Sequence, residues 1–389
     1  MKFDNQLRYA ASIVRSFHGE MPLQAWLKDF FRQHPQMGSR DRKQLSSMLY
    51  SYYRLGHCLP DVSPEEKILA GVFLCNQVPS ELLQYLKPLW NEKISAPLSE
   101  KLSVLGIEDA AASIFPWSSE LGKGIEREEF AFSHLHQPDL FIRIRPGHEE
   151  NVIGKLERER WQYEWLRPYC VRLPNRTKVD EMFDLNREIV VQDFSSQQIG
   201  EFMLRTGAWQ PQTPLKTWDC CAGSGGKSIL LHDLHPAVNL TVSDIRSSIL
   251  QNLKTRFAEA GLKNYRSFTA DLSVASSGPP ERDYDLIVAD VPCSGSGTWG
   301  RTPESLCFFN PAAIESFRVL QQKIISNVAG YLKKGGVLIY ITCSVFEREN
   351  EWVADMIQRE IGLRLLDRQL FAGYPFRADS MFAGSFVAN

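Results

Sequence analysis

The stretch TWDCCAGSGGKS, from Thr217 to Ser228, decides the fold that this sequence predicts. It reads as a short strand that enters a glycine-rich turn, and the turn leads into the start of a helix. Two later segments also read as strand ends followed by polar turns: DVPC at Asp290–Cys293 and ITCS at Ile341–Ser344. Ligands bind beyond the carboxyl ends of the strands in an open α/β sheet, so the three turns predict one shared site.

Predicted strands alternate with predicted helices from residue 188 onward, which favours a mostly parallel sheet of the Rossmann-like α/β class. The expected strands are 217–221, 240–244, 265–271, 284–290, 337–342 and an antiparallel last strand at 380–387. The expected helices are 226–234, 247–260, 311–332 and 347–361, with Lys333–Gly336 closing the third of them.

The residues before this sheet predict two further domains. Residues 1–130 show helical spacing of apolar side chains, and residues 131–187 read as a small strand–helix–strand insert, which leaves 188–389 for the third domain. Residues 1–60 carry nine lysines and arginines against four aspartates and glutamates, whereas residues 61–137 carry six against twelve. This asymmetry is compatible with a polyanion contact or with solvated helix faces. A basic helical face is expected at Arg40, Arg42, Lys43 and Arg54.

The insert is rich in arginine and aromatic side chains. They could grip single-stranded nucleic acid by charge and stacking, or the aromatics could be core and the arginines surface. The residues concerned are Arg143, Arg145, Arg158, Arg160, Trp161, Tyr163, Trp165 and Arg167.

Composition excludes several classes of protein. The chain of 389 residues is 43% apolar and 23% charged, ordinary values for a soluble globular chain. It has no apolar run long enough for a membrane span and no signal-peptide pattern, so a cytoplasmic location is expected. The eight cysteines show no CxxC spacing, which favours neither a disulfide framework nor a metal site.

The glycine loop allows three kinds of nucleotide ligand. A P-loop needs a glycine where Cys221 stands, and a dinucleotide fingerprint needs one at Ser228. S-adenosylmethionine needs only the loop, an acidic residue for the ribose and a polar group for the adenine. Asp244 follows Gly226 by 18 residues, at the end of the second strand, and Asp271 ends the third. The sequence therefore favours S-adenosylmethionine.

Cys293 and Cys343 follow neighbouring strands of such a sheet, in turns rich in glycine and serine. A free cysteine is more often a small buried hydrophobe, an interpretation that suits Cys58, Cys75, Cys170 and Cys220 better than these two. Carbon 5 of cytosine becomes nucleophilic only after a thiolate adds to carbon 6, so a thiol beside a methyl donor suggests this chemistry. We expect Asp290 to bond the base or the cofactor amine, and Lys227 to favour a thiolate or hold negative charge.

At these residues the chain resembles the Sun-type (NOL/NOP/Sun) RNA cytosine-5 methyltransferases, over about residues 140–389. The resemblance rests on VVQDFSSQ (191–198), CCAGSGGKS (220–228), SDI (243–245), DVPCSGSGTWGRTPES (290–305) and ITCSVFEREN (341–350). It implies a class I methyltransferase core, with Cys343 as the attacking thiol and Cys293 assisting release. The cofactor contacts that it implies are Cys221, Ala222, Gly223, Ser224, Gly225, Gly226, Lys227, Asp244, Asp271 and Asp290.

The N-terminal segment GSRDRKQLSSMLYSYYRL (38–55) resembles the NusB-like domain of bacterial 16S ribosomal RNA members. This resemblance implies a helical domain that faces the RNA and assists the catalytic domain. It makes ribosomal RNA the first expected substrate and tRNA the second. Three positions depart from the family pattern: the loop reads AGSGGK rather than APGGK, Arg145 replaces an asparagine, and Ala378 replaces a proline.

Two other functions stay open at this point. A non-catalytic RNA-binding factor could keep the fold, but it need not keep both thiols and the cofactor aspartates. A P-loop ATPase is disfavoured by Cys221. The oligomeric state is not readable from the sequence.

Overall fold

The computed structural model describes residues 3–207 and 212–389, which form two compact units. The helical unit contains the residues up to 121 together with 126–137 and 298–311. The sheet unit contains 122–125, 138–297 and 312–389.

The helical unit is built on α1, α3 and α4, which pack against one another around a shared apolar core. Leu7, Ala10 and Ala11 of α1 are buried, as their helical spacing predicts. The start of α4 follows directly from its sequence, because the Ser63 hydroxyl caps the helix through the N–H of Glu66 and Pro64 is the first helical residue. The helices are α1 (Phe3–Ser16), α2 (Leu23–Gln33), α3 (Ser39–Arg54), α4 (Pro64–Cys75), α5 (Glu81–Leu86), α6 (Pro88–Glu92), α7 (Leu98–Val104), α8 (Ala110–Ile114), η1 (Ser118–Glu120), α9 (Arg127–Ser133) and α14 (Glu304–Phe308).

Residues 298–311 belong to this unit although they follow the Cys293 turn in the sequence. The Glu304 carboxylate accepts the buried N–H of Leu23 at 2.9 Å, at the first residue of α2. The Arg54 guanidinium donates to the carbonyl of Gly300 at 3.0 Å and also to that of His134 at 2.8 Å. Arg54 is therefore buried, and its expected place on an exposed basic face is wrong.

The sheet unit contains a seven-stranded sheet in the order β10-β11-β9-β8-β5-β6-β7. The five strands from β9 to β7 in this order are parallel, whereas β11 runs antiparallel between β9 and β10. Its strands are β5 (Leu215–Asp219), β6 (Val238–Asp244), β7 (Tyr265–Thr269), β8 (Tyr284–Asp290), β9 (Leu332–Thr342), β10 (Arg364–Phe371) and β11 (Met381–Val387).

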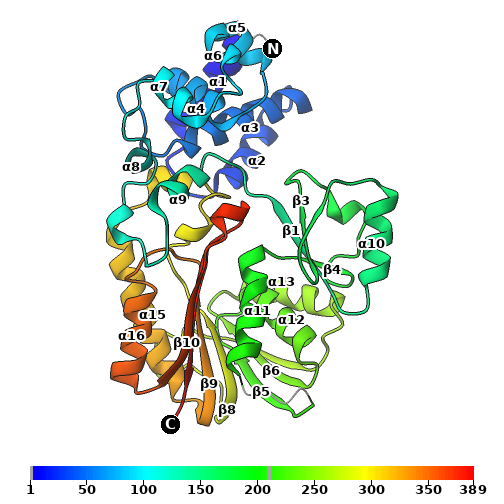
Figure 1. Ribbon diagram of the computed structural model, residues 1–389. Helices are drawn as coiled ribbons and strands as arrows, with labels where there is room; N and C mark the ends of the chain where they lie inside the picture. The colour runs from blue at the N-terminus through cyan, green and yellow to red at the C-terminus, as the bar shows by residue number, and fades with distance from the viewer. Residues whose placement is uncertain (1–2, 208–211) are drawn as a thin grey trace. The chain divides into compact units, whose positions relative to one another are not determined.

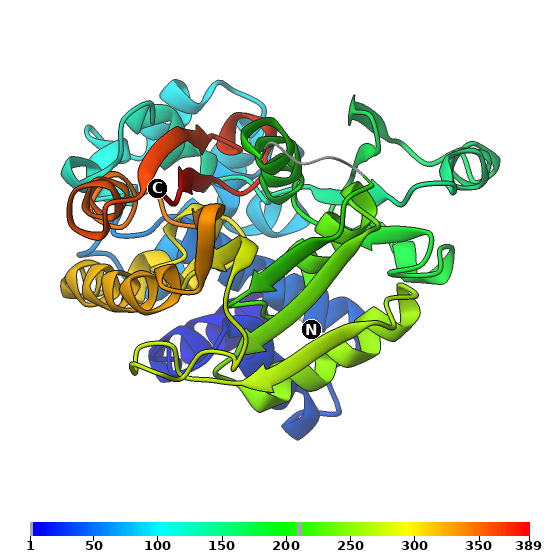
Figure 2. The same ribbon diagram turned by 90° about the horizontal axis from the view of Figure 1, so that it is seen from below.

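Helices cover both faces of this sheet (Figures 1 and 2). One face carries α15 (Ala312–Ala329), α16 (Glu351–Met356) and the π-helix η4 (Ile357–Ile361), which pack on an apolar core that includes Trp218. The other face carries α11 (Phe194–Thr206), α12 (Gly226–Leu234) and α13 (Ser247–Glu259). Because both faces are covered, β8 is an almost continuous buried apolar run.

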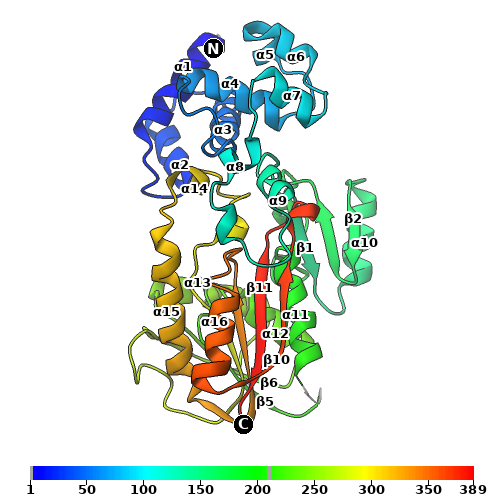
Figure 3. The same ribbon diagram turned by 60° about the vertical axis from the view of Figure 1, so that its left-hand side comes forward.

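A second, four-stranded antiparallel sheet has the order β2-β3-β1-β4. Its strands are β1 (Leu140–Ile144), β2 (Glu164–Arg167), β3 (Cys170–Leu173) and β4 (Ile189–Val191), and α10 (Glu149–Arg158) lies between β1 and β2 in the chain (Figure 3). Helix α10 packs on one face through Val152 and Leu156. The opposite face carries Phe141, which packs against Phe194 of α11. Three short 3₁₀ turns complete the elements: η2 (Val179–Glu181), η3 (Ser296–Thr298) and η5 (Tyr374–Phe376).

The predicted fold class is confirmed: a mostly parallel Rossmann-like sheet, a small α/β element before it and an all-helical N-terminal region. Within residues 3–207 and 212–389, no helix is both long and apolar enough to cross a membrane.

Candidate active site

The thiols of Cys293 and Cys343 lie next to each other, with their Sγ atoms 3.3 Å apart. Strands β8 and β9 are parallel neighbours, and Asp290 pairs with Ile341 at their carboxyl ends. Each cysteine follows its strand within three residues, so the register brings both side chains to one place. The hydrogen bond with Cys343, together with burial and the negative charge of Glu349, raises the pKa of the Cys293 thiol well above its usual value.

Lys227 and Asp290 form an ion pair at the same edge of the sheet as the two thiols. Lys227 Nζ, in the first turn of α12, lies 2.6 Å from Asp290 Oδ2 at the end of β8. Burial alone would lower the pKa of Lys227, but the Asp290 carboxylate raises it above its usual value, with a smaller contribution from Cys343. The lysine is therefore a fixed cation within electrostatic reach of the Cys343 thiol.

The glycine loop makes a tight turn between β5 and α12. Gly223 and Gly225 have φ of +54° and +83°, which glycine adopts without strain. A Cβ on Gly225 would lie 2.4 Å from the Phe257 ring, whereas one on Gly223 would meet nothing within 4 Å. Arg256 holds the loop by donating to Ser224 Oγ at 2.8 Å. The backbone at Gly223 is thus open for a ligand to approach closely.

The two candidate ribose and adenine contacts already have partners. Asp244, buried at the end of β6, accepts the N–H of Gly223 at 3.0 Å and the Arg246 guanidinium at 3.1 Å. Arg246 is largely exposed, so its side chain can leave when a ribose needs the carboxylate. Asp271 is exposed and accepts the backbone N–H and the hydroxyl of Ser273, which lower its pKa.

The Glu349 side chain forms hydrogen bonds with both of the turns that carry Cys293 and Cys343. This fully buried carboxylate accepts the N–H of Ser294 at 2.8 Å, the hydroxyl of Ser344 at 2.7 Å and the amide of Gln321 at 3.1 Å. Ser294 follows Cys293 and Ser344 follows Cys343, so one side chain fixes both turns. Burial raises the pKa of Glu349, while its three hydrogen-bond donors oppose this shift.

We expect Glu349→Gln to lower kcat for any reaction that needs both thiols by at least about tenfold, because the amide presents a donor where the carboxylate accepts. The Kd of a ligand held by the glycine loop should not change. Steady-state rates and calorimetry measure the two quantities, with Glu360→Gln, on the exposed end of η4, as the control. A wild-type kcat in Glu349→Gln would show that the carboxylate does not position the thiols.

Asp219 gives the site a pH-dependent component of stability. Burial raises its pKa to about 7, although the Ser228 hydroxyl donates to its Oδ2 at 2.6 Å. A carboxyl whose folded pKa is raised contributes stability that is present at about pH 4 and is lost as the pH rises through 7. We expect the fall in the free energy of unfolding between pH 5 and pH 8 to be about 2–4 kcal/mol smaller in Asp219→Asn than in the wild type. Urea titrations at four pH values measure this, and parallel pH profiles would contradict it.

The sequence-predicted residues fall into two groups in the structure. Direct contacts link Cys293 with Cys343, Lys227 with Asp290, and Gly223 with Asp244. The remaining loop residues lie in the same turn: Cys221 and Ser224 are half-buried, Ala222 donates its N–H to the Ser243 carbonyl, and Gly226 begins α12. Asp271 follows β7, apart from these contacts, and bonds only within its own turn.

Sequence reasoning missed Arg246, Arg256, Glu349 and the serine hydroxyls around Ser344. Arg256 and Glu349 form contacts between distant segments, which no spacing reveals, whereas Arg246 contacts Asp244 only two residues away. Glu349 does lie inside the motif ITCSVFEREN, so that segment offered a signal. In the part of the chain that the structure describes, no group of three His, Cys, Asp or Glu side chains could hold a metal ion.

Known proteins are similar to this chain over part of its length. Residues 208–377 match the family model described as 16S rRNA methyltransferase RsmB/F. Ribosomal RNA small subunit methyltransferase B of Yersinia enterocolitica is 30% identical over 236 residues, covering 57% of this chain and 52% of the relative. The probable ribosomal RNA small subunit methyltransferase B of Bacillus subtilis is 30% identical over 231 residues, covering 58% and 50%. The chain thus spans about half the length of these curated relatives.

Solved structures share the fold at low sequence identity. The crystal structure of PH0851 has a TM-score of 0.69 at 19% identity and covers 97% of this chain and 96% of its own. NSun6 from Pyrococcus horikoshii, solved with SFG, has a TM-score of 0.58 at 14% identity and covers 70% of this chain and 97% of its own.

Proposed function

Since this chain belongs through residues 208–377 to the Sun-type family of RsmB/F methyltransferases, we propose that it methylates carbon 5 of a cytosine in RNA, with S-adenosylmethionine as the donor. The observation that carries the proposal is the pair of thiols 3.3 Å apart at the ends of β8 and β9. The names of the curated relatives make small-subunit ribosomal RNA the first candidate substrate. The SFG ligand of NSun6, an analogue of S-adenosylmethionine, supports the choice of donor.

The glycine loop fits S-adenosylmethionine better than a phosphate-bearing nucleotide. The open backbone at Gly223 and the carboxylate of Asp244 suit a nucleoside, and Asp271 is exposed for the adenine. Lys227, which would hold phosphates in a P-loop, is instead paired with Asp290. When bound, the donor supplies the methyl group that carbon 5 accepts.

We assign the attack to Cys343. Its Sγ forms a bond to carbon 6, which turns carbon 5 into a nucleophile, and the cation of Lys227 lies at the same sheet edge, where it balances negative charge that develops in this step. After methylation, carbon 5 gives up its proton to water, the electrons of that C–H bond re-form the carbon 5–carbon 6 double bond, and the Sγ–carbon 6 bond breaks, which frees the Cys343 thiolate and restores the aromatic ring. Cys293, whose Sγ lies 3.3 Å from that of Cys343, donates its proton to the departing thiolate and so assists this release. Asp290 orients Lys227 and is available to bond the base or the donor's amine.

Methyl-labelled S-adenosylmethionine tests the proposal directly. The full-length protein is incubated with 16S ribosomal RNA or with tRNA, and the digested RNA is analysed for 5-methylcytosine by mass spectrometry. Bisulfite sequencing of the same RNA then locates the cytosine. We expect labelled 5-methylcytosine in ribosomal RNA. Its absence from both RNAs, combined with calorimetric binding of ATP rather than S-adenosylmethionine, would contradict the proposal.

We propose a supporting role in RNA binding for the helical unit, because the sequence of its segment 38–55 resembles a NusB-like domain. The exposed basic side chains that remain after Arg54 is excluded include Arg40 and Lys43. Arg40 forms an exposed ion pair with Glu81, which a phosphate can replace.

A further inference from the structure

A cavity of about 270 Å³ lies in the sheet unit between the small antiparallel sheet and helices α11 and α12. None of the residues of the thiol site or of the glycine loop lines it. Its volume is slightly below the roughly 300 Å³ at which sites for drug-sized ligands begin, so it suits a smaller group. The walls combine apolar and aromatic side chains with a few charged ones, the composition of a ligand site rather than of a packing defect.

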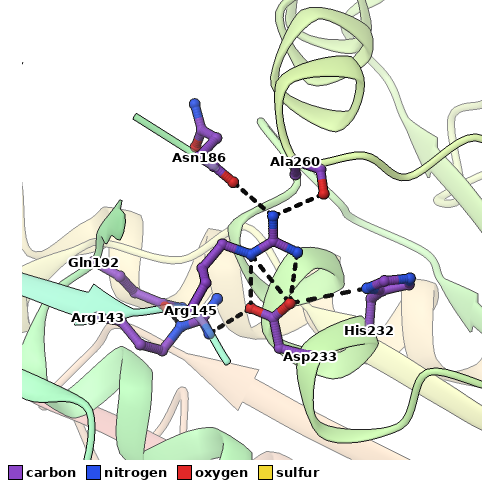
Figure 4. Close-up of polar contacts among 7 residues, drawn as sticks. All are labelled: Arg143, Arg145, Asn186, Gln192, His232, Asp233 and Ala260. Carbon is purple, nitrogen blue, oxygen red and sulfur yellow. Dashed lines mark hydrogen bonds and ion pairs between the residues drawn. The ribbon is translucent and has the colours of Figure 1, made fainter. Parts of the chain in front are cut away.

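Two guanidinium groups meet one carboxylate beside this cavity (Figure 4). Arg143 Nη1 lies 2.6 Å from Asp233 Oδ2, and Arg145 Nη2 lies 2.7 Å from Asp233 Oδ1. All three side chains are at least nine-tenths buried, so two guanidinium groups share one carboxylate. Arg143 and Asp233 line the cavity, and Arg143 Nη2 has no hydrogen-bond partner among the described residues. The wall therefore favours a ligand that presents a hydrogen-bond acceptor.

The remaining walls suit a flat ring. The Arg167 guanidinium lies over the Phe194 ring, 5.9 Å from its centroid, and is held there by Glu201 at 2.5 Å. Tyr169 is 47% exposed at the turn between β2 and β3, where its φ is +70°. Leu230 of α12 also lines the cavity. Aromatic and guanidinium surfaces of this kind stack on unpaired bases of RNA.

We propose that this cavity receives one unstacked nucleobase of the RNA, away from the cytosine that is methylated. A carbonyl oxygen of the base faces the Arg143 guanidinium, and its ring lies among Tyr169, Phe194 and Arg167. A free phosphate would satisfy the arginine but would leave the apolar walls without a partner. This assignment rests on the proposed function, because it takes RNA to be the substrate.

Filling the cavity tests the assignment without disturbing the buried charges. Gln198 is half-buried on α11 and lines the cavity, so the larger side chain of Gln198→Trp fills the cavity. Tyr169→Ala removes the exposed aromatic ring that lines it. Trp352→Ala removes an exposed aromatic side chain of α16 and serves as the control. Filter binding measures the Kd for small-subunit ribosomal RNA, and melting curves confirm that each variant is folded. Irradiation with RNA that contains 4-thiouridine locates the contact by mass spectrometry.

We expect Gln198→Trp and Tyr169→Ala to raise the Kd for RNA at least tenfold, while the Kd for S-adenosylmethionine and the kcat at saturating RNA stay unchanged. The cross-link should fall within residues 167–170 or at Phe194 and disappear in Gln198→Trp. If folded Gln198→Trp binds RNA as the wild type does, the cavity is not a base site, whatever the methylation assay shows. If the wild type cross-links here but methylates no RNA, the proposed function fails and the base site stands.

Discussion

Replacing Cys343 by alanine is expected to reduce methyl transfer to RNA by about four orders of magnitude or more, because carbon 5 of cytosine does not attack a methyl donor unless a thiolate has added to carbon 6. The Kd for S-adenosylmethionine should not change, since the thiol lies beyond the glycine loop contacts. Initial rates with labelled donor measure the loss. Cys75→Ala, in α4 of the helical unit, is the matched control and should behave as the wild type.

The result separates the attacking thiol from its neighbour. Cys293 lies only 3.3 Å away, so the variant also shows whether this neighbouring thiol can take over the attack. Substantial activity in Cys343→Ala, with loss of activity in Cys293→Ala, would mean that the two roles are reversed.

The second large effect concerns stability. Asp233→Ala removes the carboxylate that pairs with the buried Arg143 and Arg145, and it leaves two buried guanidinium charges without this partner between the small sheet and α12. Removing one side of a buried ion pair destabilises a protein by about 3–5 kcal/mol, a large part of the usual free energy of unfolding. Although burial opposes ionisation, contacts with His232, Arg145 and Arg143 hold the pKa of Asp233 well below its usual value.

Chemical denaturation compares this variant with Asp367→Ala, which breaks an exposed ion pair with Arg205 and should cost less than about 1 kcal/mol. If Asp233→Ala does not fold, Asp233→Asn keeps the shape and allows the measurement. Equal losses in the buried and the exposed variants would contradict the account of the cluster.

Much of the sheet could be predicted from the sequence. The strands at 217–221, 240–244 and 284–290 were expected within two residues of β5, β6 and β8, because buried parallel strands read as short apolar runs. The antiparallel last strand is also confirmed as β11. Strand β10 (Arg364–Phe371) was not expected, since its half-buried residues give neither an apolar run nor a clear alternation. Helix α15 ends at Ala329, and Lys333–Gly336 belongs to β9 rather than to a helix end.

The arginines of the insert show where sequence reasoning stops. Arg143 and Arg145 were expected in solvent or against RNA, yet both are buried on Asp233, which lies about 90 residues further along the chain. Arg145 stands where the family has an asparagine, and its contacts with Asp233, Asn186 and Ala260 give that departure a structural role. Trp161 and Tyr163 pack against the apolar core under α10, whereas Trp165 is exposed. Burial of a charged side chain depends on a partner that only the folded chain supplies.

The candidate site was predictable as a set of strand ends, because topology alone brings parallel strand ends to one edge. The buried side chains that hold this site in place were not predictable from the sequence. Glu349 reaches the cysteine turns from the turn before α16, and Gln321 reaches them from α15. No periodicity in the sequence predicts that a carboxylate is buried there. The grouping of 298–311 with the helical unit likewise depends on long-range contacts such as that of Glu304 with Leu23.

A covalent adduct between protein and RNA tests the central claim most directly. The Cys293→Ala protein, incubated with S-adenosylmethionine and 16S ribosomal RNA and resolved on a denaturing gel, should accumulate a slowly migrating protein–RNA species, because attack proceeds and release is impaired. The double variant Cys293→Ala/Cys343→Ala should form none. An adduct of equal yield in the double variant, or one mapped to a residue other than Cys343, would contradict the account.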